Sequence, residues 1–295
     1  MSSAPPLNEV MRVGERGAAL IFVLWLITAI TLLVTGMSAS RNAIVLDTHV
    51  AIARLRAKVA IDSALEVAVE QLRGQTVHPD GKLELKFDDV AVSVLTTAES
   101  GRIDLNGASD ELIGGLVSTA VEDRDEAAKL TDAILDWRDE NDLRHPQGAE
   151  ESDYRRAELG YAPANGPFRY AGQLRLVLGM TPDIAKRLEP MVTTETGSDE
   201  IDLSGASASV FRAHDLAQGL DVGTGPLKEE DNQPPPFTTD SSGLYRIDLQ
   251  AVVDGGFTSR AVAIAWVYPT TSGRDYEIMD YQGWLLPRDS GSNKG

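Results

Sequence analysis

Twelve aspartates and glutamates lie between Glu122 and Asp153, a stretch whose side chains suit the binding of a hard cation. Ca²⁺ takes about six to eight oxygen ligands from carboxylates, amides and carbonyls, and this stretch offers many of them within a short reach. It is not an EF-hand, because Arg138 occupies the third position counted from Asp136 and Leu143 the fifth counted from Asp139.

A calcium site and a solvated acidic helix face both remain open as interpretations of this stretch. In the second, Arg124, Arg138 and Arg144 act as surface ion-pair partners that contribute little stability each. For the first, the candidate ligands are Asp136, Asp139, Asn141, Asp142, Glu150 and Asp153.

Catalytic chemistry finds little support in the chain. The four histidines stand singly without metal-ligand spacing, and there is no cysteine. No G-x-S-x-G, Walker or H-E-x-x-H motif occurs. The pair Asp136 and Asp139 could in principle serve as a glycosidase acid and base, but only 6% of residues are aromatic, which argues against a sugar cleft. The chain is therefore predicted not to be an enzyme.

The elements that position the candidate ligands follow an apolar segment near the N-terminus of the given sequence. The run from Ala18 to Ser40 has no charged residue and is long enough to cross a bilayer core of ~30 Å. A signal peptide has a shorter apolar core of ~7–15 residues, although 38–40 is a passable cleavage site. Arg12 and Arg16 favour a cytoplasmic N-terminus. A signal peptide, a simple anchor and a pilin-like subunit remain the alternatives.

Two features favour the pilin-like subunit. Gly17 followed by Ala18 resembles the type IV prepilin processing site, at which a peptidase cuts after glycine and leaves the apolar helix on the mature protein. Residues 41–73 contain neither proline nor glycine, repeat apolar residues with roughly helical spacing, and are followed by Gly74. They do not hold a strict heptad, which disfavours a coiled-coil stalk.

Beyond Gly74 the pattern predicts a hairpin, a helical block and further strands. Residues 83–87 and 90–95 alternate with a period of two around Asp88-Asp89, and strand patterns return at 244–249, 260–268 and near 276–286. Residues 101–195 are expected to be helical, and 224–240 to form a loop. Two flanking groups of strands suggest a helical domain inserted into one antiparallel sheet.

A repeated sequence motif suggests two related helical units, near 101–195 and near 200–222. Residues 102–109 read RIDLNGAS, and residues 200–207 read EIDLSGAS. Either Asn106 and Ser204 or Ser109 and Ser207 can cap the helix that follows each. The alternative, a helix-hairpin-helix fold on nucleic acid, is disfavoured because the net charge of −18 repels phosphates.

Four stretches in order resemble the K-type minor pseudopilins (the GspK family) of the type II secretion system, and the resemblance covers nearly the whole length. These stretches are residues 16–20, 102–106, 134–139 with 148–150, and 161–168 continuing to 174–181. The resemblance implies cleavage between Gly17 and Ala18, N-methylation of Ala18, and calcium in the inserted helical domain. It also implies partnership with the I- and J-type minor pseudopilins and the major pseudopilin. Prepilin peptidase would be the processing enzyme.

The fifth mature position adds to the resemblance. Most pilins and pseudopilins carry glutamate there, where it is thought to pair with a neighbouring subunit's N-terminal amine, whereas this chain has Phe22. A carboxylate in lipid is costly without a partner, and a tip subunit has no subunit above it.

The expected fold class is α+β, with a pilin-like long N-terminal helix on an antiparallel sheet and a large inserted all-helical domain. The expected divisions are a leader (1–17), the transmembrane half (18–40) and periplasmic half (41–73) of the helix, first strands (74–104), the inserted domain (105–237) and C-terminal strands (238–295). The expected function is a pseudopilus-tip subunit in the inner membrane, with its bulk in the periplasm, that initiates assembly and supports protein export. The alternative is a membrane-anchored periplasmic binding module unrelated to secretion.

Overall fold

The computed structural model describes residues 12–225, 235, 237–240, 242–268 and 275–283, except for the side chains of 12–19 and 34–49. The chain divides into two compact units, residues 1–56 and 57–295. The described elements are α1 (Arg12–Arg73), β1 (Lys82–Phe87), β2 (Val90–Ala98), β3 (Ile103–Asp104), α2 (Asp110–Ser118), α3 (Arg124–Arg138), α4 (Glu151–Arg156), η1 (Ala171–Leu176), α5 (Pro182–Leu188), η2 (Glu189–Met191), β4 (Val192–Thr193), η3 (Leu203–Gly205), α6 (Ala208–Ala217), β5 (Leu244–Val253), β6 (Phe257–Val267) and β7 (Tyr276–Gln282).

Helix α1 includes all of residues 41–73, as their spacing predicted, and it stops just before Gly74. The amide of Gly74 donates to the carbonyl of Glu70 at 2.9 Å, and Gln75 takes a left-handed φ of 53°, so the chain turns away. Residues 20–33 of α1 are exposed. Among the residues searched, which are only the described ones, no helix meets the length and apolarity needed to span a membrane. The predicted span at 18–40 lies partly outside the described residues and stays a prediction.

In the second unit, α1 packs on the sheet through small side chains. Its buried apolar residues recur with helical spacing, and four of them are alanines: Ala57, Ala60, Ala64 and Ala68. The opposing strands β5 and β6 also bury alanines, among them Ala251 and Ala263. Small apolar residues are therefore buried on this part of the helix and on the strands alike.

The sheet is antiparallel, with strand order β1-β2-β5-β6-β7. The alternating segments predicted to be strands lie in β1, β2, β5, β6 and β7, although residues 284–286 of the last one are outside the described residues. Asp88-Asp89 forms the turn of the β1–β2 hairpin, with φ of 54° at Asp88. Strands β2 and β5 are neighbours although about 145 residues separate them, with Val94 opposite Leu249. Everything between these two strands is thus inserted into one sheet. The mixed helix and antiparallel-sheet class predicted from the sequence is confirmed. The prediction that residues 101–195 are helical throughout was wrong, because β3 and β4 pair there as a short parallel sheet with Ile103 opposite Val192.

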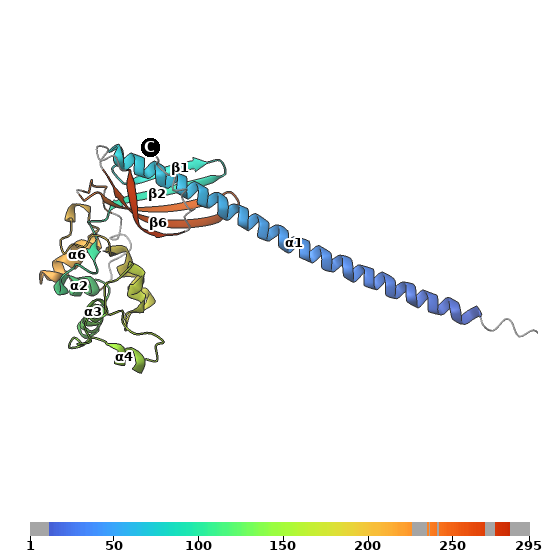
Figure 1. Ribbon diagram of the computed structural model, residues 1–295, viewed down its shortest axis with the longest axis horizontal. Helices are drawn as coiled ribbons and strands as arrows, with labels where there is room; N and C mark the ends of the chain where they lie inside the picture. The colour runs from blue at the N-terminus through green and yellow to red at the C-terminus, as the bar shows by residue number, and fades with distance from the viewer. Residues whose placement is uncertain (1–11, 226–234, 236, 241, 269–274, 284–295) are drawn as a thin grey trace, which may run out of the picture. The chain divides into compact units, whose positions relative to one another are not determined.

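The inserted part leaves the sheet after β2 and returns at β5, and its two ends are tied together. The amide of Glu99 donates to the carbonyl of Leu244 at 3.0 Å, and that of Ser100 to Asp240 Oδ2 at 3.2 Å. Figure 1 shows helices α2, α3, α4 and α6 grouped beside the sheet. Their core is built from buried residues such as Leu105, Leu116 and Ile134.

The two similar segments, residues 102–109 and 200–207, each lead into a helix that is capped in the same way. Ser109 Oγ accepts from the amide of Leu112 before α2, and Ser207 Oγ accepts from the amide of Val210 before α6, each at 3.3 Å. Of the two pairs of capping residues that the sequence left open, Ser109 and Ser207 are therefore the ones that cap the helices. The helices α2 and α6 pack against each other, and Gly115 allows their backbones to approach closely.

Candidate functional site

Helix α3 carries two of the acidic side chains on one face, because Asp132 and Asp136 are four residues apart. The helix begins after Asp123, whose side chain accepts from the amide of Glu126 at 2.8 Å. It ends at Arg138, whose guanidinium donates to the carbonyls of Leu105 and Ala108 at 2.9 and 2.8 Å. The end of α3 is thereby fixed to the segment that leads into α2.

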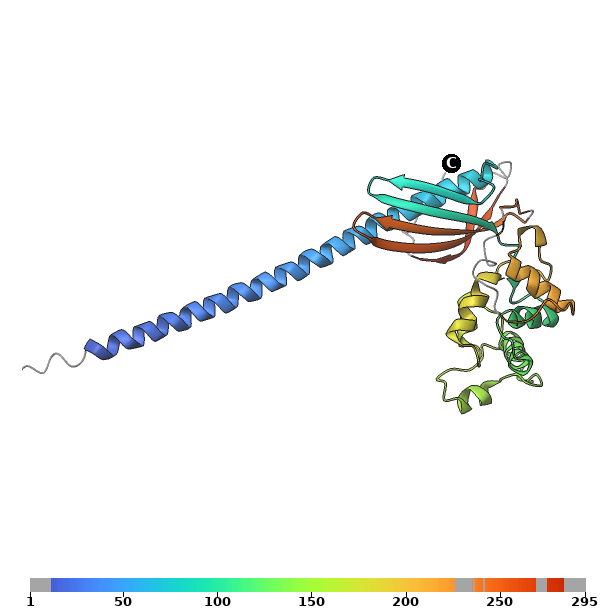
Figure 2. The same cartoon turned by 180° about the vertical axis from the view of Figure 1, so that it is seen from behind.

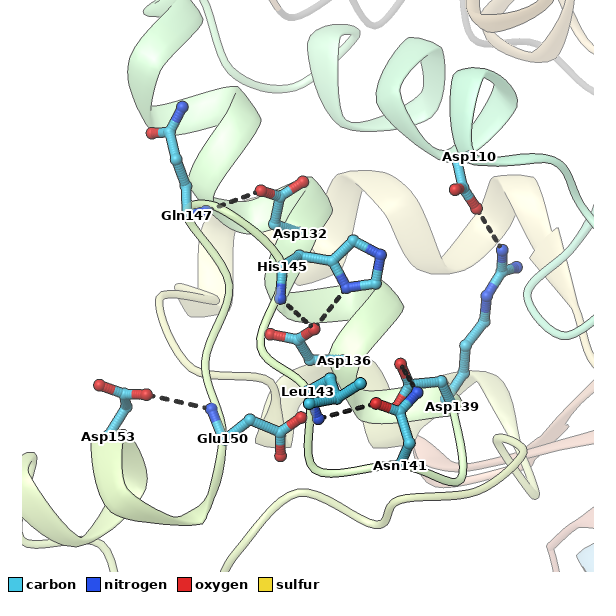
Figure 3. Close-up of polar contacts among 11 residues, drawn as sticks. Asp110, Asp132, Asp136, Asp139, Asn141, Leu143, His145, Gln147, Glu150 and Asp153 are labelled. Carbon is cyan, nitrogen blue, oxygen red and sulfur yellow. Dashed lines mark hydrogen bonds and ion pairs between the residues drawn. The ribbon is translucent and has the colours of Figure 1, made fainter.

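The loop after α3 folds back over the helix and closes on Asp136, which is fully buried. Asp136 Oδ1 accepts from the backbone amide of His145 at 3.0 Å and lies 2.5 Å from its Nδ1 (Figure 3). The amide of Gln147 donates to Asp132 Oδ2 at 2.9 Å. A Cβ at Gly148 would stand 1.9 Å from Asp136 Oδ2, so the loop can approach this closely only with glycine there.

Four carboxylate oxygens in this region are buried without a hydrogen-bond partner among the described residues. They are Asp136 Oδ2, Asp139 Oδ1, and both Oε1 and Oε2 of Glu150, whose residue is only 7% exposed. Buried carboxylates are costly unless they are paired or coordinate a metal ion. The arrangement is therefore suited to a cation with oxygen ligands.

The pKa of Glu150 is affected by its burial and by the acidic residues around it. Its burial raises the pKa of its carboxyl above the ordinary value, and the negative charges of Asp136, Asp139, Asp142 and Asp153 raise it further. All four of these acids are thus close enough to repel Glu150. A divalent cation among them would reverse the sign of that interaction.

The six predicted ligands do not all have the same freedom to bind. Figure 3 shows Asp136, Asp139, Asn141 and Glu150 around the returning loop, with Asp153 on the far side of Glu150. Asn141 Nδ2 donates to Asp139 Oδ2 at 2.9 Å, and Asn141 Oδ1 accepts from the amide of Leu143 at 2.7 Å.

Asp142 and Asp153 are engaged elsewhere. Asp142 Oδ1 accepts from Asn165 Nδ2 at 2.7 Å. Asp153 Oδ1 pairs with Arg156 at 2.7 Å, and its Oδ2 accepts from the amide of Glu150 at 3.1 Å. Burial raises the pKa of Asp153, but these two hydrogen bonds together with the positive charges of Arg144 and Arg156 outweigh it, and the pKa is lowered. In this arrangement Asp153 positions Glu150 more than it offers a free oxygen.

Two residues of the site were missed by the sequence reasoning. His145 was taken as one of four isolated histidines, yet it, Asp136 and Asp139 each place one potential ligand atom within 4.8 Å of the others. Asn165 joins the site from a separate segment and has a buried Oδ1 without a partner among the described residues. Its φ of 44° is left-handed, a conformation that asparagine tolerates better than most residues. The Asn165-Gly166 dipeptide was the available signal.

The segments that carried the family resemblance meet behind this site. Trp137 stacks on Phe168 with ring centroids 5.9 Å apart, and lies 6.2 Å from Tyr154. Asn106 Nδ2 donates to the carbonyl of Phe168 at 2.9 Å, while its Oδ1 accepts from the amide of Phe168 at 2.7 Å. Three motifs that are far apart in the sequence therefore form one support for the acidic loop.

The contact between His145 and Asp136 predicts a pH dependence for the metal-free protein. The hydrogen bond to Asp136 raises the pKa of His145 above its ordinary value of 6.5, and burial opposes this only partly. The stabilisation is then complete below pH 6.5 and is lost as the pH rises through the raised pKa. In EGTA, the melting midpoint should fall over this interval, and His145→Gln should remove that part of the fall. His78→Gln, at a histidine far from the site in the sequence, is the matched control. An unchanged pH profile in His145→Gln would contradict the assignment.

The predicted processing site lies at the other end of the chain. Gly17 and Ala18 fall within α1, but their side-chain surroundings are outside the described residues. Phe22, at the predicted fifth mature position, is 74% exposed. Cleavage between Gly17 and Ala18, and the place of Phe22 as the fifth mature residue, therefore stay predictions.

Comparisons with known proteins agree with the resemblance predicted from the sequence. Residues 94–195 match the family model described as type II secretion system (T2SS), protein K. Within the curated proteins, the chain is 34% identical over 77 residues to a type II secretion system protein K of Pectobacterium carotovorum subsp. carotovorum. That alignment spans 26% of this chain and 24% of the relative, so it covers about a quarter of the relative's length.

A solved structure shares the fold. It is the crystal structure of the GspK-GspI-GspJ complex from the type 2 secretion system of enterotoxigenic Escherichia coli. The match has a TM-score of 0.59 at 14% identity, and it covers 79% of this chain and 97% of that chain. The predicted resemblance to the K-type family is confirmed by these findings.

Proposed function

We propose that this chain, whose residues 94–195 match the protein K family, is a minor pseudopilin of a type II secretion system. The observation that carries the proposal is this match, because it falls on the inserted helical part that a simple pilin-like sheet would lack. The solved structure with the same fold comes from a GspK-GspI-GspJ complex, which supports I- and J-type minor pseudopilins as partners. The major pseudopilin and prepilin peptidase are proposed as further partners.

The proposed position of this subunit is the tip of the periplasmic pseudopilus. Residues 18–40 would hold the subunit in the inner membrane before assembly, with the N-terminus in the cytoplasm and the second unit in the periplasm. The inserted helices add bulk to the sheet, and such bulk would obstruct a further subunit stacking above. The subunit would therefore help to initiate the pseudopilus and so support export across the outer membrane.

Calcium is proposed as a structural ion of the inserted part. The unpartnered oxygens of Asp136, Asp139 and Glu150 are the proposed first ligands, with Asp142 and Asn141 beside them. Their chemistry suits a hard cation, because all the donors are oxygen. The chain's own contribution is to hold these oxygens through His145 and the loop glycine, Gly148, against their mutual repulsion. Bound calcium would supply the positive charge that the cluster lacks.

The proposed work is binding and not catalysis. That the chain is not an enzyme stays a prediction, since the protein K family is described only as part of a secretion system. The alternative function is a membrane-anchored periplasmic binding module unrelated to secretion. The two functions differ at Gly17, because only a pseudopilin needs cleavage there.

Replacing Gly17 with valine is expected to abolish processing almost completely. Protein recovered from inner membranes of the native host should begin at Ala18, N-methylated, in the wild type and at Met1 in the variant. N-terminal sequencing and intact mass measure this directly. Gly14→Val, a glycine three residues earlier in the same segment, is the matched control and should be processed. An intact Met1 in the wild type would favour the simple anchor, and a start near Arg41 would indicate a signal peptide.

A further inference from the structure

The inserted part contains two Asn-Gly dipeptides, Asn106-Gly107 and Asn165-Gly166. The first precedes α2, and the second lies in the segment between α4 and η1, which runs from light green to yellow in Figure 2. All four residues are partly exposed, so water reaches both dipeptides. A glycine after asparagine leaves the backbone free enough for the glycine amide nitrogen to approach the side-chain amide carbon of the asparagine. Both dipeptides therefore have the composition that spontaneous deamidation requires.

The first dipeptide is held in place by hydrogen bonds and by packing. Asn106 Nδ2 and Oδ1 both bond to the backbone of Phe168, and the amide of Gly107 donates to Asp104 Oδ1 at 3.1 Å. A Cβ at Gly107 would stand 2.6 Å from the carbonyl oxygen of Ser198, so the backbone is tightly packed there. Bringing the amide nitrogen of Gly107 onto the side chain of Asn106 therefore breaks three hydrogen bonds and displaces packed backbone.

The second dipeptide is held less firmly. Asn165 Oδ1 is buried without a hydrogen-bond partner among the described residues, while its Nδ2 donates to Asp142 Oδ1 at 2.7 Å. The amide of Gly166 donates to the carbonyl of Trp137 at 3.3 Å, beyond the usual range for such a bond. Apart from its chain neighbours, a Cβ at Gly166 would meet only the carbonyl oxygen of Ala164, at 3.8 Å. The same movement here breaks two hydrogen bonds, one of them long, and displaces no packed backbone.

From this contrast we propose that Asn165 is a site of spontaneous deamidation, whereas Asn106 is protected by the fold. The amide nitrogen of Gly166 bonds to Cγ of Asn165, the Cγ–Nδ2 bond breaks, and Nδ2 leaves as ammonia with the proton of that amide. The product is a cyclic imide. Water then adds to one of the imide carbonyls and opens the ring, which yields aspartate or isoaspartate at position 165. Water is the only co-reactant, and nothing is oxidised or reduced.

The modification adds a carboxylate to the acidic cluster around Asp136. The hydrogen bond from Asn165 Nδ2 to Asp142 Oδ1 is replaced by the repulsion of two negative charges. Deamidation therefore gives this cluster a negative charge that the sequence does not encode. The inference does not depend on the proposed function, because the reaction needs neither calcium nor a partner protein.

The test incubates the full-length protein in detergent at mildly alkaline pH, below its melting midpoint, and follows its tryptic peptides by mass spectrometry over time. Trypsin releases peptides 103–124 and 157–169, each of which contains a single asparagine. The mass gained when an amide becomes an acid measures each conversion, and a sample digested at time zero corrects for conversion during digestion. Asn165 should convert at least about tenfold faster than Asn106, because its ring closure breaks fewer hydrogen bonds.

Two controls connect the result to the fold and to the reaction route. In urea the two asparagines should convert at similar rates, because the fold then holds neither of them. Gly166→Ala should slow the conversion of Asn165 strongly, because a side chain hinders ring closure, and the added methyl group has room in the native structure. Asn165→Asp provides the chromatographic standard for the aspartate product.

Three results would overturn the inference. The first is conversion of Asn106 in the native protein as fast as that of Asn165 or faster. The second is a native protein in which Asn165 is still intact when both asparagines have converted in urea. The third is equal conversion of Asn165 in the wild type and in Gly166→Ala, which would exclude the cyclic imide as the route.

Discussion

Replacing Asp136 with asparagine is expected to abolish the thermal stabilisation that calcium gives to this protein. Asp136 is fully buried, its Oδ2 has no described partner, and it lies among the proposed ligands Asp139 and Glu150. At a free calcium concentration of 100 times the Kd, binding to the native state contributes about 2.7 kcal/mol. For a unit of this size, that corresponds to a rise in the melting midpoint of about 5–10 °C. Differential scanning fluorimetry with calcium and with EGTA measures it.

The matched control is Asp132→Asn, one turn earlier on the same face of α3. Asp132 Oδ2 accepts from the amide of Gln147 but is not among the proposed ligands, so this variant should keep the calcium response. Magnesium should raise the wild-type midpoint less, because it demands a tighter octahedral geometry. A wild type with the same midpoint in calcium and EGTA would eliminate the calcium proposal. A full response in Asp136→Asn would instead place the ion elsewhere.

Replacing Gly115 with alanine should destabilise the inserted part by about 3 kcal/mol, because the added methyl group overpacks the contact between α2 and α6. A Cβ at Gly115 would stand 2.1 Å from the carbonyl oxygen of Ala213 and 2.9 Å from the amide nitrogen of Ala217. Both are backbone atoms, so no side-chain rotation can relieve the contact. Urea unfolding of the full-length protein in detergent, followed by the fluorescence of tryptophans such as Trp137, gives the free energy of unfolding.

The neighbouring glycine provides the control. A Cβ at Gly114 meets only Thr131 Cγ2, at 3.9 Å. Since alanine is favoured over glycine within a helix by about 1 kcal/mol, Gly114→Ala should leave stability unchanged or raise it slightly. Equal effects from the two substitutions would show that helix propensity, and not the close approach of α2 and α6, decides the outcome.

The sequence by itself determined the strands of the five-stranded sheet and the helix over residues 41–73, and it suggested a cation site that stays a proposal. Alternation around Asp88-Asp89 predicted the β1–β2 hairpin, and the absence of glycine and proline from 41–73 predicted the helix up to Gly74. These are local signals, since side-chain periodicity and turn residues act over a few positions. The density of carboxylates likewise suggested a cation site before any geometry was known.

Only the tertiary structure decided which polar groups meet. His145 reaches Asp136 because the loop folds back over α3, and Asn165 reaches Asp142 across 23 residues. The tertiary structure also distinguishes two of the predicted ligands. The carboxylate of Asp153 is paired with Arg156, whereas the carboxylate oxygens of Glu150 have no described partner. The choice of Ser109 and Ser207 as helix caps depended on where α2 and α6 begin. Hydrogen bonds and ion pairs of this kind depend on the positions of atoms from distant segments, which periodicity within one segment does not specify.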